Sequence, residues 1–99
     1  MHKRTKAVAI TPQVRQEVED RDGGCCIFCG RRGRGEGHYV NRSQGGLGIP
    51  ENIVTVCRDC HREMDNGLYT KVFRQKAEEY LKSKYPDWDK NKLVYNKWG

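Results

Sequence analysis

Cys26-Ile-Phe-Cys29 and Cys57-Arg-Asp-Cys60 are the two stretches that decide the fold of this chain of 99 residues. In each stretch two residues separate the cysteines, and such a turn bends the backbone so that both sulfurs face one ion. Four thiolates at about 2.3 Å satisfy tetrahedral zinc and leave no open coordination position, which is typical of structural rather than catalytic sites. We therefore expect one structural Zn²⁺ bound by Cys26, Cys29, Cys57 and Cys60.

The composition favours a domain that is stapled by a metal. Hydrophobic residues make up 35% and charged residues 32% of the chain, so the apolar core is small. A chain of this size often needs a disulfide or a metal to offset the entropy of folding. The fifth cysteine, Cys25, could pair with Cys29 in place of Cys26, but without the geometry of the two-residue turn. Residues 30–56 exceed the connection of a simple zinc ribbon, so they house another feature.

Hydropathy and charge indicate the compartment and the partner. No segment reaches the roughly 18 apolar residues of a transmembrane span, and the start of the chain lacks the apolar stretch of a signal peptide. We expect a cytoplasmic chain with no membrane partner. In the reducing cytoplasm, paired cysteines bind metal more often than they form disulfides. Free or disulfide-bonded cysteines are the alternative. The net charge of +6 favours a polyanionic partner, although a merely solvated exterior would carry such a charge as well.

Caps, β-branched runs and helical faces predict the order of the elements. Thr11-Pro12 begins a short helix that ends near Asp22, because a hydroxyl caps a helix and proline fits its first position. Residues 31–35 are too rich in glycine and charge for a helix and are predicted as a loop. After a basic, poorly ordered arm at 1–10, we expect strands at 38–40 and 53–56 and helices at 58–66 and 69–84.

A resemblance to a known family connects these pieces. Gly37-His38-Tyr39-Val40, Gly45-Gly46, Glu51-Asn52-Ile-Val54 and Cys57-Arg-Asp-Cys60-His61 resemble, in this order, the motif of small bacteriophage and bacterial HNH endonucleases. The resemblance covers residues 26–65. It implies an α+β fold, a small zinc-stapled ββα-metal (HNH) domain with flanking N-terminal and C-terminal helices. We expect a basic flexible arm at 1–10 and a single HNH nuclease domain at 11–99.

The resemblance implies a metal-dependent DNA endonuclease or nickase that hydrolyses phosphodiester bonds. His38 would be the general base, a role that suits histidine because its ordinary pKa of about 6.5 lies close to working pH. Asn52 would tie the connecting loop and orient the base, and His61 would bind the catalytic metal. From the residues alone, His38 could instead only pack on the sheet, and Asn52 could be a turn residue after Pro50-Glu51.

The ligands of the catalytic ion are less completely specified. Asp65 lies four residues after His61, on the same helical face, and its hard oxygen suits Mg²⁺ or Mn²⁺, with other divalent ions left open. Asp65 could instead only belong to an Asp-Asn-Gly turn. Many family members place a ligand just before the base, where this chain has Gly37. Glu36 could supply that oxygen or be solvated, and Mg²⁺ tolerates few protein ligands when water and phosphate complete its shell.

Arginines flank the expected base and suit a DNA partner. They could neutralise phosphates without reading sequence, although a solvated charged surface is the alternative. The runner-up function is a zinc-ribbon-like nucleic-acid-binding module without catalysis, and a third is an assembly protein with a relict motif. The resemblance suggests a bacterial cell or phage-infected host and partners in phage packaging or genome processing. It leaves open the cleavage specificity, the choice of strand and the oligomeric state. The DNA-binding candidates are Arg31, Arg32, Arg34 and Arg42.

Overall fold

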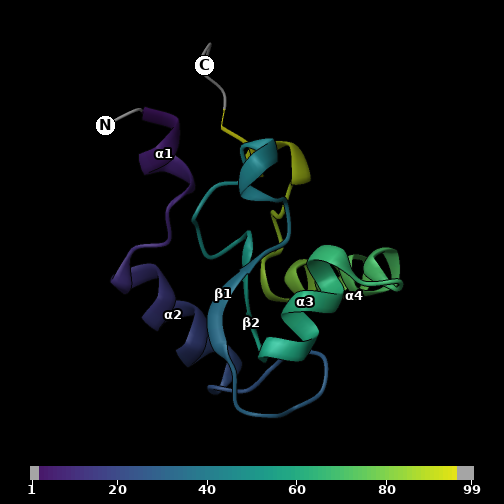
Figure 1. Ribbon diagram of the computed structural model, residues 1–99. Helices are drawn as coiled ribbons and strands as arrows, with labels where there is room; N and C mark the ends of the chain where they lie inside the picture. The colour runs from purple at the N-terminus through teal and green to yellow at the C-terminus, as the bar shows by residue number, and fades with distance from the viewer. Residues whose placement is uncertain (1–2, 96–99) are drawn as a thin grey trace.

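A two-stranded hairpin between helices forms the centre of the computed structural model, which describes the backbone of residues 3–95 and the side chains of residues 6–95. Figure 1 shows α2 on one side of the hairpin and α3 and α4 on the other. The expected α+β class is confirmed. The elements are α1 (Lys3–Val8), α2 (Pro12–Asp22), β1 (Arg34–His38), η1 (Arg42–Gln44), β2 (Ile53–Val56), α3 (Arg58–Asn66), α4 (Thr70–Lys84) and η2 (Lys90–Leu93).

Helix α2 begins and ends where the local chemistry predicts. The Thr11 hydroxyl accepts a hydrogen bond from the backbone N–H of Val14 at 3.1 Å, and Gly23 ends the helix with a left-handed φ of 68°. That conformation costs glycine little because it has no Cβ. Val18 is fully buried, and α2 packs on both strands of the hairpin. The helix therefore covers one face of the sheet.

The first strand lies earlier than the sequence indicated. Strand β2 occupies the expected residues, but β1 runs over Arg34–His38, so the expectations of a loop through residue 35 and a strand at 38–40 are wrong. Glycine is usually poor in strands, yet here it permits close packing: a Cβ on Gly35 would lie 3.0 Å from the carbonyl of Arg15 in α2. Beyond β1, the backbone of Val40 bonds to the side chain of Asn52 instead of continuing the ladder.

The interval 1–10, expected to lack regular structure, contains helix α1. Tertiary contacts hold its end, because Val8 is only 6% exposed and the backbone N–H of Gly48 donates to the carbonyl of Ala7 at 3.0 Å. Residues 1–2 of the expected arm lie outside the described residues. A basic sequence therefore does not by itself keep this segment from ordering on the domain.

Helices α3 and α4 close the other face of the hairpin. Helix α3 has the bounds expected from the sequence, and α4 begins one residue later than expected. Met64 from α3 and Ala77 and Leu81 from α4 are fully buried and join Val54 and Val56 in one apolar cluster. This small core fixes α3 against β2, so that residues at the ends of both elements keep constant relative positions.

A buried ion pair joins the end of α2 to the hairpin and to α4. The Asp22 side chain has no exposed surface and accepts hydrogen bonds from the guanidinium of Arg21 at 2.7 Å, the backbone N–H of Thr55 at 2.9 Å and the hydroxyl of Tyr80. Burial raises the pKa of Asp22, but these hydrogen bonds, that of Arg21 foremost, outweigh burial and lower it below its ordinary value. The carboxylate therefore stays ionised inside the fold.

We predict that Asp22→Asn lowers the free energy of unfolding at pH 7 by about 3 kcal/mol, because it leaves a buried guanidinium without its charge partner. Because the folded pKa of Asp22 is depressed, its contribution is present above the unfolded value and is lost as the pH falls through the folded one. The difference in free energy of unfolding between wild type and variant, measured by urea unfolding, should therefore become smaller at acidic pH. The matched control is Asp20→Asn, an exposed change that should cost less than about 0.5 kcal/mol; equal losses for both variants would contradict the prediction.

Candidate active site and zinc centre

The four cysteines of the paired turns form one cluster. Their sulfurs all lie within 4.8 Å of one another, and those of Cys29 and Cys57 are 3.6 Å apart. Gly30, with a φ of 81°, closes the first turn by donating its N–H to the carbonyl of Cys26. Cys57 caps α3, where its sulfur accepts the backbone N–H of Cys60 at 3.4 Å. The turn before β1 and the first turn of α3 thus meet at one point, and Cys25 lies outside the cluster.

The pKa values of the clustered thiols differ from one another. Burial raises the pKa of the Cys57 thiol, but the backbone N–H of Cys60 and the neighbouring thiols reverse this and lower it to about 7. For Cys60, burial and the neighbouring thiols together raise the pKa far above its ordinary value. The protein alone therefore stabilises one thiolate and opposes the next. A divalent ion removes this opposition, and a set of four thiolates suits a structural Zn²⁺.

A cavity of about 730 Å³ opens on the other side of α3. It brings together the base and metal ligands that the sequence proposed, and Ala9 and Ile10 from the N-terminal segment form part of its wall. Of the four candidate DNA-binding arginines, only Arg42 lines it. The polar side chains around the cavity include Arg15, Glu36, His38, Arg42, His61 and Asp65.

His38, at the end of β1, is 7% exposed. Its Nε2 lies 2.9 Å from the carbonyl oxygen of Val8, and because a carbonyl can only accept, Nε2 carries the proton. In the neutral ring Nδ1 is then the acceptor. Burial lowers the pKa of His38 below its ordinary value, with a smaller contribution from the positive charge of Arg42. The ring is therefore neutral at neutral pH, as a general base must be.

His61 and Asp65 face each other on α3. Their Nε2 and Oδ2 atoms are 3.2 Å apart, and both side chains are about one third exposed, so water and a ligand can reach them. Asp65 lies within the helix and not in a turn beyond it. Among the residues whose side chains the structure describes, no third histidine, cysteine or acidic residue joins this pair in a compact metal-binding group. The arrangement offers two ligands and room for water.

Glu36 occupies an irregularity in β1. The register shifts between Gly35, opposite Thr55, and Gly37, opposite Val54, so Glu36 is the extra residue of a β-bulge. Bulges re-aim side chains and are frequent beside active sites. Here the bulged residue lines the cavity together with His38.

Asn52 is fully buried and holds the loop that follows the base. Its Oδ1 accepts the N–H of Val40 at 2.8 Å, and its Nδ2 donates to the carbonyls of Val40 at 3.2 Å and Leu47 at 2.8 Å. These bonds link the two ends of the connection between the strands. They fix the backbone two residues after His38.

The candidate DNA-binding arginines are exposed but not gathered in one place. Arg31 approaches Asp59 at 3.8 Å, with both side chains at least 70% exposed. Arg34 begins β1, opposite Val56 beside the zinc ligands, and Arg32 forms an isolated bridge with Cys25. Arg42 alone lies at the cavity.

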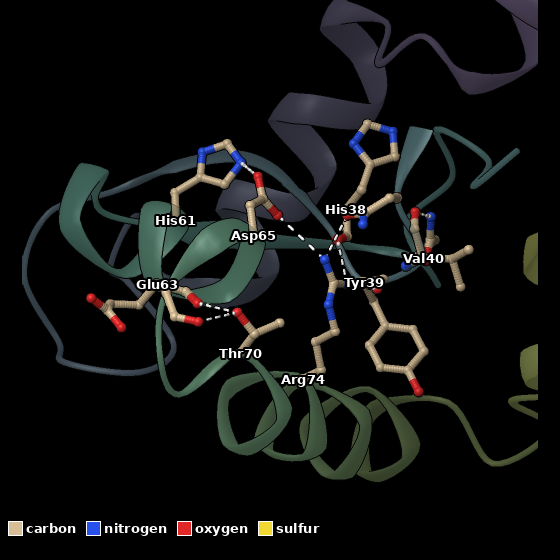
Figure 2. Close-up of polar contacts among 11 residues, drawn as sticks. His38, Tyr39, Val40, His61, Glu63, Asp65, Thr70 and Arg74 are labelled. Atoms are coloured by element: carbon tan, nitrogen blue, oxygen red, sulfur yellow. Dashed lines mark hydrogen bonds and ion pairs between the residues drawn. The ribbon is translucent and has the colours of Figure 1, made fainter. Parts of the chain in front are cut away.

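Two further groups at this site have no signature in the sequence. Arg74 from α4 donates to the carbonyl of Tyr39 and pairs with Asp65 at 3.5 Å, as Figure 2 shows. Arg74 is one of 19 lysines and arginines in the chain, so its residue type does not distinguish it from the others. The carbonyl of Val8 belongs to the backbone, so no residue type could have indicated it.

A hairpin and a helix that meet at a four-cysteine cluster and share a cavity lined by His38 and His61 define the class of this domain, a ββα-metal fold. Residues 26–67 match the model of the family described as HNH endonuclease. The family recognised from the sequence is thereby confirmed, and the chain carries an HNH endonuclease domain. Such domains bind nucleic acid and are generally nucleases, so a nuclease-type function is indicated. The chain matched none of the curated proteins and none of the solved structures with which it was compared. No helix among the described residues is long and apolar enough to cross a membrane.

We predict one tightly held zinc per chain and loss of the fold on strong chelation, because metal binding and folding are coupled in small domains. Elemental analysis and circular dichroism measure the two. Cys57→Ser should abolish zinc binding, whereas Cys25→Ser, a control one residue before the cluster, should keep one zinc per chain. An intact fold with no metal after chelation would refute the prediction.

Proposed function

We propose that this protein is a metal-dependent DNA endonuclease or nickase that hydrolyses phosphodiester bonds. The observation that carries the proposal is the neutral, buried His38, which shares a cavity with the His61–Asp65 pair. The location of this cavity inside the region that matches the HNH family supports the same assignment. A pure binding module has no use for a buried base beside an open pair of ligands.

In this proposal His38 accepts the proton of the attacking water at Nδ1, because Nε2 is engaged by Val8. His61 holds a divalent ion, Mg²⁺ or Mn²⁺, together with Asp65, and Glu36 is the candidate third ligand. Such an ion, when bound, stabilises negative charge on the phosphate and on the leaving oxygen. Asn52 acts through His38 by holding the loop that follows it.

The proposed setting follows from the resemblance. DNA is the proposed substrate, bound in part by Arg31, Arg32, Arg34 and Arg42. We further propose a single nuclease domain at 11–99, against which residues 7–10 of the N-terminal segment pack, a cytoplasmic location in a bacterial or phage-infected cell, and partners in phage packaging or genome processing. The alternative, a zinc-ribbon-like module that binds nucleic acid without cutting, predicts binding to plasmid DNA without cleavage in any divalent ion.

We predict that His38→Ala lowers the rate of plasmid cleavage about 10²–10⁴-fold, the range for a lost general base. His61→Ala should also abolish most cleavage, but excess Mn²⁺ should partly restore it, because mass action refills a weakened metal site. No metal concentration replaces a missing base, so His38→Ala should show no rescue. The measurement is a titration of cleavage rate against Mn²⁺ for each variant.

Further variants and controls complete this titration. Asp65→Ala should behave as a milder His61→Ala, and Glu36→Ala should show a small effect that Mn²⁺ removes. Each variant must keep one zinc per chain, so that loss of the fold is not read as loss of catalysis. Cleavage by His38→Ala at the rate of wild type would show that the proposed mechanism is wrong.

We predict that substitution of Arg31, Arg32 and Arg34 by glutamine reduces the salt dependence of DNA binding. Each lost phosphate contact lowers the slope of log affinity against log salt by about 1. Fluorescence anisotropy without divalent ions measures binding in the absence of cleavage. The charge-matched control replaces Lys82, Lys84 and Lys92, three exposed lysines near the C-terminal end. Equal slopes for both triple variants would mean that the arginines are only solvated.

A further inference from the structure

The N-terminal segment reaches the active site although it lies outside the region that matches the HNH family. The match covers residues 26–67, whereas the cavity wall includes Ala9 and Ile10. The carbonyl of Val8 contacts the His38 ring at 2.9 Å. A segment far from the motif in sequence thus supplies a hydrogen-bond partner of the proposed base.

The loop between the strands is shaped to receive this segment. The N–H of Gly48 donates to the carbonyl of Ala7 at 3.0 Å. A Cβ on Gly48 would lie 2.1 Å from the carbonyl oxygen of Ala9, so only glycine permits this approach without displacement. Val8 is also buried. One hydrogen bond, one close backbone contact and one buried side chain therefore hold the Val8 carbonyl opposite His38.

The contact restricts what the imidazole can do. A carbonyl has no proton to give, so it selects the ring with its proton on Nε2 and leaves Nδ1 to accept. It also opposes rotation of the ring, which would exchange the two nitrogens. Both effects concern the position of a proton and not the stability of the fold.

We propose that residues 7–10 are part of the active site and that the carbonyl of Val8 is a positioning group for His38. This carbonyl holds the base as the Nε2-protonated tautomer, with Nδ1 available to receive the proton of water. The inference rests on the proposed role of His38 as general base. A segment outside the family motif would then affect the rate of catalysis by the proposed base, His38.

The test makes the carbonyl of Val8 a weaker hydrogen-bond acceptor in the full-length protein. Cys25 follows Gly24, so a synthetic peptide of residues 1–24 can be joined to residues 25–99 by ligation at this cysteine. Replacing Ala9 by its α-hydroxy acid makes the carbonyl of Val8 an ester carbonyl, a weaker acceptor. The matched control replaces Ile10 in the same way and weakens the carbonyl of Ala9, which faces Gly48 and not His38.

Two readouts separate positioning from stability. The ¹⁵N shifts of the His38 imidazole report which nitrogen carries the proton, and steady-state cleavage gives kcat and KM. In the Val8 ester we expect the two nitrogen shifts to move towards each other and kcat to fall about 10-fold, by analogy with the low end of the effect of groups that orient metal-ligating histidines. KM should be unchanged, and the control ester should match wild type in both readouts. Gly48→Ala, a variant that needs no synthesis, should change both readouts in the same direction.

The outcomes decide between the alternatives. A proton on Nδ1 of His38 in the wild type, or nitrogen shifts and kcat no different between the two esters, overturns the inference. If the Val8 ester changes the shifts but not kcat, the contact fixes the tautomer without serving catalysis, and the inference is also overturned. If wild type cuts no DNA in any divalent ion, the proposed function fails, and with it the catalytic part of this inference. The shifts still report whether the Val8 carbonyl sets the tautomer.

Discussion

The close approach of four cysteine sulfurs, all within 4.8 Å of one another, is the constraint on which the rest of this structure depends, because thiolates at such distances would repel one another. A divalent ion held by the four sulfurs would remove this repulsion and link the turn before β1 to the start of α3. Aromatic packing extends this link, because the Phe28 ring lies 4.8 Å from the Phe73 ring of α4.

The cysteine cluster thereby sets the geometry of the proposed active site. His61 follows Cys60 directly in α3. The cluster that fixes the first turn of α3 therefore also fixes the direction in which His61 and, one turn later, Asp65 leave the helix. Arg74 adds a second connection, from Asp65 to the backbone after His38. Figure 2 shows this guanidinium between the α3 carboxylate and the end of β1. Helix α3, with the candidate ligands His61 and Asp65, and strand β1, with the candidate base His38, are thus coupled at both ends.

The sequence predicted the features that depend on residue type and spacing. The cap at Thr11, the strand at 53–56, the bounds of α3 and the paired cysteines all have local chemical signatures, and the structure contains each of them. The misplaced first strand has a different cause. Gly35 and Gly37 suggest a loop by composition, and only the close approach of α2 and α3 explains why glycine is required there.

The contacts that complete the site could not have been predicted. The carbonyl of Val8 acts through the backbone, and Arg74 is chosen among many basic residues only by tertiary distance. The bulge at Glu36 arises because β1 has one residue between Gly35 and Gly37, whereas their partners in β2, Thr55 and Val54, are adjacent. Neither strand shows this difference by itself. Such features follow from the assembled fold and leave no pattern in the sequence.

Gly37, where many family members place a ligand, is closely packed against the core. A Cβ on this residue would lie 3.1 Å from the Cε of Met64 and from a methyl group of Val56, so a side chain there would require these neighbours to shift by a few tenths of an ångström. The bulge instead turns the preceding residue, Glu36, towards the cavity. In the proposed function, an ion on α3 would complete its shell with water and phosphate oxygens of the substrate, with Glu36 as the candidate third ligand from the protein.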